Sequence, residues 1–357
     1  MTDSTQSPAQ QLAEEVNSIQ ASLNSLQDDV RLAKMRDEVA TIDNAVNRLP
    51  QHILELRSRG YVFENDLESE AANLKQRWTS QRPLVLQQIA QQSNMLNMDI
   101  RQVESIVSQL TARSNNPSGA QPIVNQAKAA LNSLESKINA AEGTIRGMYR
   151  AFNNDADNMN AHLRDLDWML QQLAQAAFDL LPTEAGIMAV KATWIKGRKE
   201  SKDDPEGILY LTDQRLIFEQ KQEIATKKVL FITTEKQTVQ KLLMETPLAL
   251  MTAIKPSKQG LFGHEDHLEL SFASGAPFYA AHFHIDGQDC NAWQGLLNRA
   301  KDKDFDKGRA VAVDQEAVEK VKAAPTQCPI CGGAITAPVL RGMDSITCEY
   351  CGSVIRL

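Results

Sequence analysis

The chain has 357 residues, 42% of them hydrophobic and 5% aromatic, which is enough for two or three domains with buried cores. Its formal charge of −7 argues against a general nucleic-acid-binding protein, because phosphate contacts need a basic surface. The N-terminus has no basic segment followed by an apolar one, and the longest apolar stretch, residues 247–254, is far shorter than the ~20 residues that cross a bilayer. We therefore expect a cytoplasmic protein that contacts membranes only peripherally, at an inner membrane face.

Residues 1–182 have the pattern of a long helical coiled coil. Apolar residues recur at alternating steps of three and four, which is the heptad spacing of helices that pack against one another. The pattern predicts three helices, over residues 8–49, 65–113 and 123–181. The Asn-, Pro- and Gly-rich segment 114–122 predicts a loop, so the second and third helices should form an antiparallel hairpin with the first alongside. The heptads leave open whether the coil is an intramolecular spacer or a self-association surface.

Single residues refine this pattern. Ser7 before Pro8 fits the start of the first helix, because the hydroxyl can cap backbone N–H groups and proline is preset for the first turn. Pro50 is expected to end that helix. Trp78 and Trp168 fall on or near the apolar stripes and are predicted to be core residues.

Residues 184–304 change to short alternating segments, which indicates a small β domain. Strands are predicted over residues 188–195, 207–212, 215–218, 229–234, 248–254, 267–272 and 278–285. A closing amphipathic helix is predicted over 289–301, with Trp293 on its apolar face.

The segment GILYLTDQRLIF at residues 207–218 resembles the hairpin that marks GRAM and bacterial PH-like domains. Trp293 also matches the habit of this superfold of packing an aromatic side chain from the closing helix onto the barrel. The resemblance implies a PH-like β-barrel with a C-terminal helix, which binds lipid head groups or protein partners and is rarely catalytic.

The first inter-strand loop is one candidate binding surface, because this loop cradles phosphates in PH domains. Here it carries Lys196, Arg198 and Lys199, which could meet an anionic head group. Asp203 and Asp204 offset this charge, and the apolar residues 208–210 stand where the phosphoinositide pattern has a basic pair. We favour a solvated, mixed-charge loop as the interpretation.

The segment 255–263 is the second candidate surface. It places Leu261 and Phe262 between glycines and beside Lys255 and Lys258, so its tip could enter a membrane interface or a partner groove. The alternative, which we favour here, is that both apolar residues fold back over the open end of the barrel.

Other polar residues are weaker candidates. His282, His284 and Asp286 alternate along one predicted strand and so share a face, but an ordinary polar sheet face explains them better than a metal site does. Cys290 is expected to be a small buried residue.

The C-terminus contains the strongest chemical pattern. Cys328, Cys331, Cys348 and Cys351 form two C-x-x-C pairs separated by residues 332–347, which is the spacing of a Cys₄ zinc site. Four thiolates leave no open coordination position, so we predict one structural Zn²⁺; a redox dithiol is the alternative.

Both pairs match the "C-P-x-C-G" and "C-x-Y-C-G" forms of the zinc ribbon family, which residues 327–357 resemble. Gly332, Gly333 and Gly352 are expected to supply the unusual φ angles of the two turns. Residues 305–326 are predicted to be a linker with a short helix near 314–323.

These features predict a non-enzymatic scaffold or adaptor. The coil would self-associate or act as a spacer. The PH-like domain would dock on an anionic membrane or a protein, and the ribbon would contact protein partners. The alternative is a transcription- or nucleic-acid-associated zinc ribbon factor, although residues 327–357 have only Arg341 and Arg356 against Asp344 and Glu349. No catalytic residue is predicted, because no motif places a nucleophile, a phosphate-cradling loop or an acid/base pair.

Overall fold

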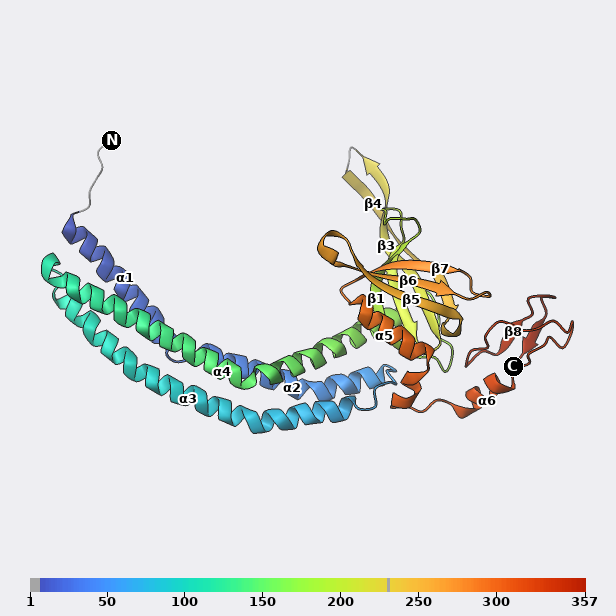
Figure 1. The fold of residues 1–357 in the computed structure, drawn as a ribbon, viewed down its shortest axis with the longest axis horizontal. Coiled ribbons are helices and arrows are strands. Elements are labelled where there is room, and N and C mark those ends of the chain that lie inside the picture. The colour runs from blue at the N-terminus through green and yellow to red at the C-terminus, as the bar shows by residue number, and fades with distance from the viewer. Residues whose placement is uncertain (1–6, 230–231) are drawn as a thin grey trace. The chain divides into compact units, whose positions relative to one another are not determined.

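The computed structural model describes residues 7–229 and 232–357, with the side chains of 7–223 and 239–357 (Figure 1). The chain divides into two compact units. One unit comprises Met1–Pro50 and Ser69–Asn160, and the other comprises Gln51–Glu68 and Ala161–Leu357. Within the described ranges, no helix is both long and apolar enough to cross a bilayer.

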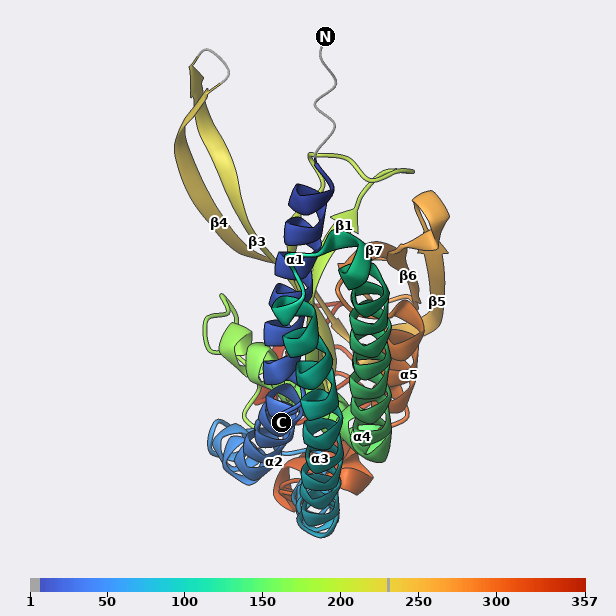
Figure 2. The same ribbon diagram turned by 90° about the vertical axis from the view of Figure 1, so that its left-hand side faces the viewer.

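Four long helices make up the first half of the chain: α1 (Pro8–Asp29), α2 (Ala33–Ser58), α3 (Leu67–Ala112) and α4 (Pro117–Leu173). In the first unit α3 and α4 run side by side with α1 and α2 along them (Figures 1 and 2). Arg77 of α3 pairs with Asp155 of α4 at 2.8 Å, and Lys137 of α4 pairs with Asp99 of α3 at 2.9 Å. Because the early part of one helix meets the late part of the other, α3 and α4 are antiparallel, as predicted.

The predicted first helix is divided and extended. It breaks after α1, where the buried Leu32 takes a positive φ of 52°, and α2 then continues through Pro50, which was expected to end it. Ile53 and Leu56 beyond that proline are buried, so the packing of one more apolar turn outweighs the hydrogen bond that proline removes. Ser7 caps α1 in a capping box with Gln10, as the sequence indicated.

The last predicted helix starts earlier and ends earlier than the range 123–181. It begins at Pro117 and ends at Leu173, because the residues that follow it pack on the β domain instead. Phe178 contacts Tyr210 edge-on at 5.2 Å between ring centroids, and the Ala177 N–H donates to Glu219.

The second unit contains a PH-like domain. Its strands are β1 (Gly186–Ile195), β2 (Glu206–Thr212), β3 (Arg215–Val229), β4 (Ile232–Pro247), β5 (Met251–Gln259), β6 (Glu265–Phe272) and β7 (Ala280–Asp286). They form one antiparallel sheet in the order β4-β3-β2-β1-β7-β6-β5. Helix α5 (Cys290–Lys301) follows it and buries Trp293 completely, which is the PH-like architecture that the sequence predicted.

The hairpin that carries the family resemblance is held by a buried ion pair. Arg215 is 4% exposed and its guanidinium contacts the buried carboxylate of Glu184, while Thr212 donates to the same carboxylate at 2.5 Å. A buried charge needs a partner of this kind. The Thr and Arg of the LTDQR sequence are therefore structural residues.

Three predicted strands differ from the structure. The strand predicted over 215–218 continues to Val229 as β3. The segment 229–234 is no separate strand, because β3 reaches Val229 and β4 starts at Ile232; residues 230 and 231 lie outside the described part. The segment 248–254 begins as a short 3₁₀ helix, Leu248–Leu250, and β5 then continues to Gln259.

The predicted linker is only partly a tether. Its helix is present as α6 (Gln315–Ala323), with Asp314 as the N-cap. Phe305, however, is buried against Phe63 at 5.8 Å between ring centroids, and the Ala310 N–H donates to the Val62 carbonyl at 2.8 Å. The first residues after the PH-like domain are thus packed within the second unit.

Candidate functional site

The four C-terminal cysteines come together as the sequence predicted. Their sulfur atoms all lie within 4.8 Å of one another, with Cys328 and Cys351 at 3.7 Å and Cys331 and Cys348 also at 3.7 Å. A tetrahedral site with Zn–S bonds of about 2.3 Å places its sulfurs roughly 3.8 Å apart. The donor set and spacing therefore fit one structural Zn²⁺.

Two matching turns build this cluster. The Gly332 N–H donates to the Cys328 carbonyl at 2.8 Å, and the Gly352 N–H donates to the Cys348 carbonyl at 2.9 Å. Gly332 and Gly352 have φ angles of 73° and 70°. Residues other than glycine adopt such positive φ angles only at a cost in free energy, so glycine is expected in both turns. Gly333 has no positive φ; a Cβ there would lie 2.6 Å from the Tyr350 ring, so close packing explains this glycine.

The rest of the ribbon is small. Strands β8 (Ser345–Thr347) and β9 (Val354–Arg356) form a hairpin, and Ile346 and Ile355 are its buried apolar residues beside two of the cysteines. The backbone N–H groups of Cys331 and Ile330 point at the Cys328 sulfur and lower the pKa of this thiol. Such donors favour the thiolate form that binds metal.

The first candidate docking surface is the loop between β1 and β2. Lys196, Arg198 and Lys199 are all exposed on it. The Lys196 ammonium lies over the Trp194 ring, and burial lowers the pKa of this lysine to about 8. The loop therefore presents cations at neutral pH, one of them seated on an aromatic face.

Two of the three acidic side chains of this loop are engaged within the domain, whereas Asp203 is exposed. The buried Asp204 accepts hydrogen bonds from the backbone N–H groups of Lys196 and Ser201 at 2.9 and 2.7 Å, and Glu200 contacts His284 at 2.8 Å. Asp204 thus shapes the loop from inside. The sequence had suggested instead that it offsets the charge of the exposed cations.

An exposed aromatic residue belongs to the neighbouring loop. Phe278, between β6 and β7, contacts Trp194 at 4.9 Å between ring centroids, and the adjacent Tyr279 is 82% exposed. Since β1 pairs with β7 in antiparallel register from Ile195 opposite His282, both loops lie at the same end of the sheet. A tyrosine beside exposed cations is typical of membrane interfaces.

The second candidate surface differs from its prediction in two ways. Lys255 and Lys258 lie on β5, not in a loop, and Lys258 is engaged by Asp266 at 2.6 Å and by Asp289 at 2.8 Å. Leu261 and Phe262 do not fold back over the barrel: they are 79% and 86% exposed at the turn before β6. The favoured covering role is therefore wrong, and an exposed apolar tip remains.

The histidines of β7 pair with their neighbours. His267 and His282 share a hydrogen bond of 3.0 Å, and burial lowers the pKa of His267. Within the part of the chain that the structure describes, the four cysteines are the one group that meets the geometry of a metal site. Cys290 is buried, as expected, and burial raises the pKa of its thiol.

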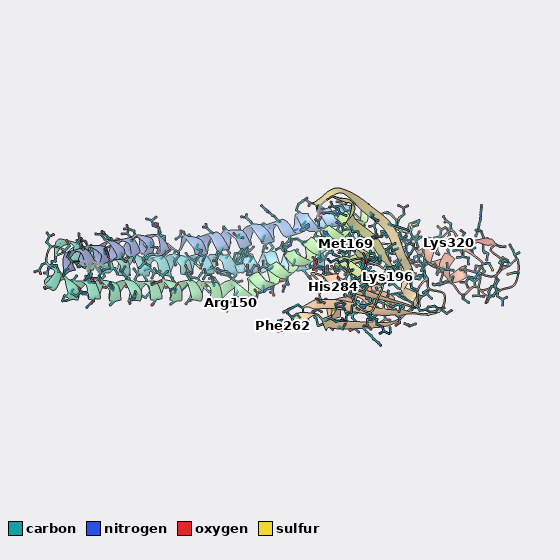
Figure 3. The ribbon with its side chains drawn as sticks, turned by 90° about the horizontal axis from the view of Figure 1, so that it is seen from above. Arg150, Met169, Lys196, Phe262, His284 and Lys320 are labelled. Carbon is teal, nitrogen blue, oxygen red and sulfur yellow. The ribbon has the colours of Figure 1, made fainter. Side chains whose placement is uncertain are left out.

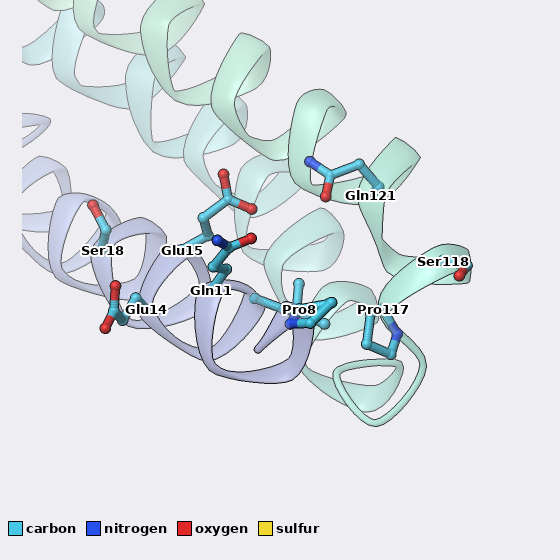
Figure 4. Close-up of a pocket in the computed structure, with 9 residues that line it drawn as sticks. Pro8, Gln11, Glu14, Glu15, Ser18, Pro117, Ser118 and Gln121 are labelled. Atoms are coloured by element: carbon cyan, nitrogen blue, oxygen red, sulfur yellow. The ribbon is translucent and has the colours of Figure 1, made fainter. Parts of the chain in front are cut away.

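Two of the pockets in the described part of the chain lie away from the ribbon. One, within the first unit, is lined by polar groups such as Gln11, Glu15 and Gln121 (Figure 4), and Glu15 pairs with Lys128 at 2.6 Å. The other lies between Trp168 of α4 and the β1, β2 and β7 strands. Trp168 is only half-buried there, so its prediction as a core residue is wrong, whereas Trp78 is buried and stacks on Phe152.

The ribbon also contacts the PH-like domain. The Arg341 N–H donates to the Gln214 side chain at 2.6 Å, and Gln214 donates back to the Arg341 carbonyl at 3.1 Å. The Arg341 guanidinium pairs with the buried Asp213, which Arg309 also contacts at 2.9 Å. No local sequence pattern indicates this contact, because Asp213 and Arg341 lie far apart in the chain.

Comparisons with known proteins add little. No protein-family model and no curated protein matches the chain. Among solved structures, the N-terminal PH domain of Vps36 is similar at 16% identity and a TM-score of 0.24, covering 35% of this chain and 84% of that chain. The DH/PH domains of PDZ-RhoGEF, in complex with activated RhoA, are similar at 14% identity and a TM-score of 0.22, covering 84% and 96%.

The DH/PH domains of p115-RhoGEF are similar at 11% identity and a TM-score of 0.21, covering 78% of this chain and 98% of that chain. TM-scores this low carry no conclusion about family or function. The PH-like description therefore depends on the strand order and closing helix seen in this chain.

Proposed function

We propose that this protein is a non-enzymatic adaptor whose PH-like domain, of the GRAM type, docks on an anionic membrane surface through its β1–β2 loop. The observation that best supports this proposal is the charge of the β1–β2 loop. Lys196, Arg198 and Lys199 are exposed. Asp204 is buried and Glu200 pairs with His284, so the exposed Asp203 offsets only part of this positive charge. The loop therefore offers a local positive surface on an acidic chain, and cations near an anionic membrane each contribute about 1 kcal/mol of binding.

The test is co-sedimentation of the full chain with vesicles that contain phosphatidylserine. Changing Lys196, Arg198 and Lys199 to Glu should weaken binding at least about 100-fold, since three favourable contacts of ~1 kcal/mol each are lost. A matched control changes Lys34, Arg36 and Lys75, exposed on the helices, to Glu. No binding of the unmodified chain at low salt, or equal loss in both triple variants, contradicts the proposal.

The exposed tip supports a second docking mode. Phe262 has a positive φ of 63° between Gly260 and Gly263, a backbone conformation that a bulky residue adopts at a cost. Leu261 and Phe262 could thus insert into a membrane interface or a protein groove. Replacing both by Ser should reduce vesicle binding if the tip enters lipid, and should leave it unchanged if the β1–β2 loop alone docks.

For the ribbon we propose one structural Zn²⁺ held by the four cysteines. Native mass spectrometry should find one zinc per chain, and Cys331→Ser should abolish it. A ribbon role in nucleic-acid binding is disfavoured, because Arg341, one of its two arginines, is already engaged by Asp213. Strong, salt-dependent binding of DNA or RNA by the full chain would reverse that preference.

A further inference from the structure

Three large apolar side chains on α3 point away from the core of the helical bundle. Leu84, Met95 and Met98 are 58%, 46% and 65% exposed, and their spacing is close to whole helical turns, which places them on one side. The segment that holds them, residues 83–98, contains no Asp, Glu, Lys or Arg. The outward side of a solvated helix normally carries charges, whereas interface cores are poor in charge and rich in Met.

The outward side of α4 is built from small residues at the same level of the bundle. Ala140, Gly143 and Gly147 are exposed, and beyond the backbone of its own helical turns a Cβ on either glycine would meet no described atom within 4 Å. Glycine inside a helix costs about 1 kcal/mol relative to alanine. Packing within the described part of the chain does not explain why glycine stands at either position, whereas close approach by another helix would explain it.

These two sets of residues are neighbours. Gln81 of α3 donates to the Met148 carbonyl of α4, and Asp99 pairs with Lys137 at 2.9 Å. Residues 81–99 and 137–148 therefore run alongside each other, so that the large side chains of α3 flank the small residues of α4. We call Leu84, Met95, Met98, Ala140, Gly143 and Gly147 the neutral face. Arg150, labelled in Figure 3, lies one turn beyond Gly147 on the outward side of α4.

We propose that the neutral face binds the neutral face of a second copy of this chain. Self-complementarity selects this occupant, because the face has large side chains on α3 and small residues on α4. The absence of charged residues from 83–98 lets two copies, each carrying −7, approach there with the least repulsion. A two-fold arrangement lets the large residues of α3 in one copy pack on the small residues of α4 in its partner, and the reverse. This surface is independent of the membrane docking proposed above.

The size of the neutral face sets the expected affinity of the dimer. Sixteen helical residues, 83–98, span roughly 24 Å at 1.5 Å per residue, and two adjacent helices are about 20 Å wide. The contact would bury on the order of 500 Å² per copy, which is typical of weak, reversible dimers. We therefore expect dissociation in the micromolar range.

The test is sedimentation velocity on the full chain from about 1 to about 100 µM, a range that brackets micromolar dissociation. The average mass should rise with concentration. Leu84→Glu with Met98→Glu should weaken the dimer at least tenfold, because each new carboxylate is then buried against the small α4 residues of the partner without an opposite charge. Gly147→Leu should also weaken it at least tenfold, while raising the thermal midpoint of the bundle through better helix propensity.

Opposite effects on stability and assembly separate this proposal from misfolding. Ala21→Leu and Ser25→Glu, at exposed positions of α1, serve as matched controls and should leave the dimer unchanged. The proposal is overturned if the unmodified chain stays monomeric throughout the range. It is equally overturned if the Gly147 and Leu84/Met98 variants assemble as well as the unmodified chain, since another surface would then make the dimer.

Discussion

The C-terminal ribbon and the PH-like domain are both antiparallel β-structures, yet different forces hold them. Trp194, Phe218 and Phe283 contact one another in the sheet core, and α5 adds the buried Trp293. The ribbon buries only Ile346 and Ile355 beside its cysteines. Ordering each residue costs about 1–2 kcal/mol of backbone entropy, which so small a core cannot offset. The proposed metal therefore does in the ribbon what aromatic burial does in the PH-like domain.

Removing the metal ligand should have the largest effect. In Cys348→Ser the ribbon should lose zinc and unfold, because structural zinc contributes about 10 kcal/mol or more to such modules. Hydrogen exchange should show lost protection in residues 327–357 and retained protection in residues 186–301. Cys290→Ser removes a buried cysteine of the PH-like domain and should keep zinc. A ribbon that keeps its hydrogen-exchange protection without metal would contradict the proposed role of zinc in holding it.

Truncating the aromatic core should act on the other module. Phe283→Ala removes a fully buried ring and should cost about 3–5 kcal/mol of unfolding free energy in the PH-like domain. Urea denaturation followed by Trp fluorescence measures this, and a chelator competition assay measures the zinc affinity. The reciprocal change is Ile346→Val, which removes a smaller apolar group from the core of the ribbon. Parallel loss of zinc in Phe283→Ala would show that the two modules fold as one.

The same contrast explains what the sequence could predict. The cysteine cluster depends on residues close in the chain, so its spacing alone predicts the ligands. The β2–β3 hairpin is equally local, and the segment 207–218 predicts it. The exposed Leu261 and Phe262 show the limit of prediction from local sequence. Their apolar character suggested burial, but only the surrounding fold decides whether a surface is available to cover them.

Long-range contacts account for the other differences. Phe178 and Ala177 leave the helical pattern because the PH-like sheet offers Tyr210 and Glu219 as partners, which no local pattern reveals. The predicted strand 229–234 fails for a related reason: β3 and β4 pair through a ladder in which Lys221 lies opposite Gln240, and such polar stretches show no alternation of apolar residues.

The contact between ribbon and PH-like domain should have a moderate effect. Arg341→Ala removes one of two guanidinium partners of the buried Asp213, and losing a charged hydrogen bond there should cost about 1–3 kcal/mol. Hydrogen exchange in residues 339–343 should rise while zinc is retained. Arg356→Ala, an exposed ribbon change of equal charge, is the control. Unchanged exchange in Arg341→Ala would mean that the ribbon docks without this pair.

The smallest predicted effect is on the cap of α5. The Asp289 carboxylate accepts from the N–H groups of Asn291 and Ala292 at 2.9 and 3.0 Å. The Lys258 ammonium, followed by these amides, lowers the pKa of Asp289 to about 2, below its ordinary value near 4. The ionised cap therefore stabilises the domain above about pH 4, and this contribution is lost as the pH falls through about 2.

Asp289→Asn keeps a side-chain acceptor and removes the charge, so it isolates this contribution. The carboxylate is half-exposed, which limits the effect to below about 1 kcal/mol. The difference in unfolding free energy between the two chains should be present at pH 7 and vanish near pH 2. The ribbon should respond first, because protons displace zinc from thiolates at much higher pH. Acid should thus release the metal before it weakens α5, and the reverse order would contradict the division of forces between the two modules.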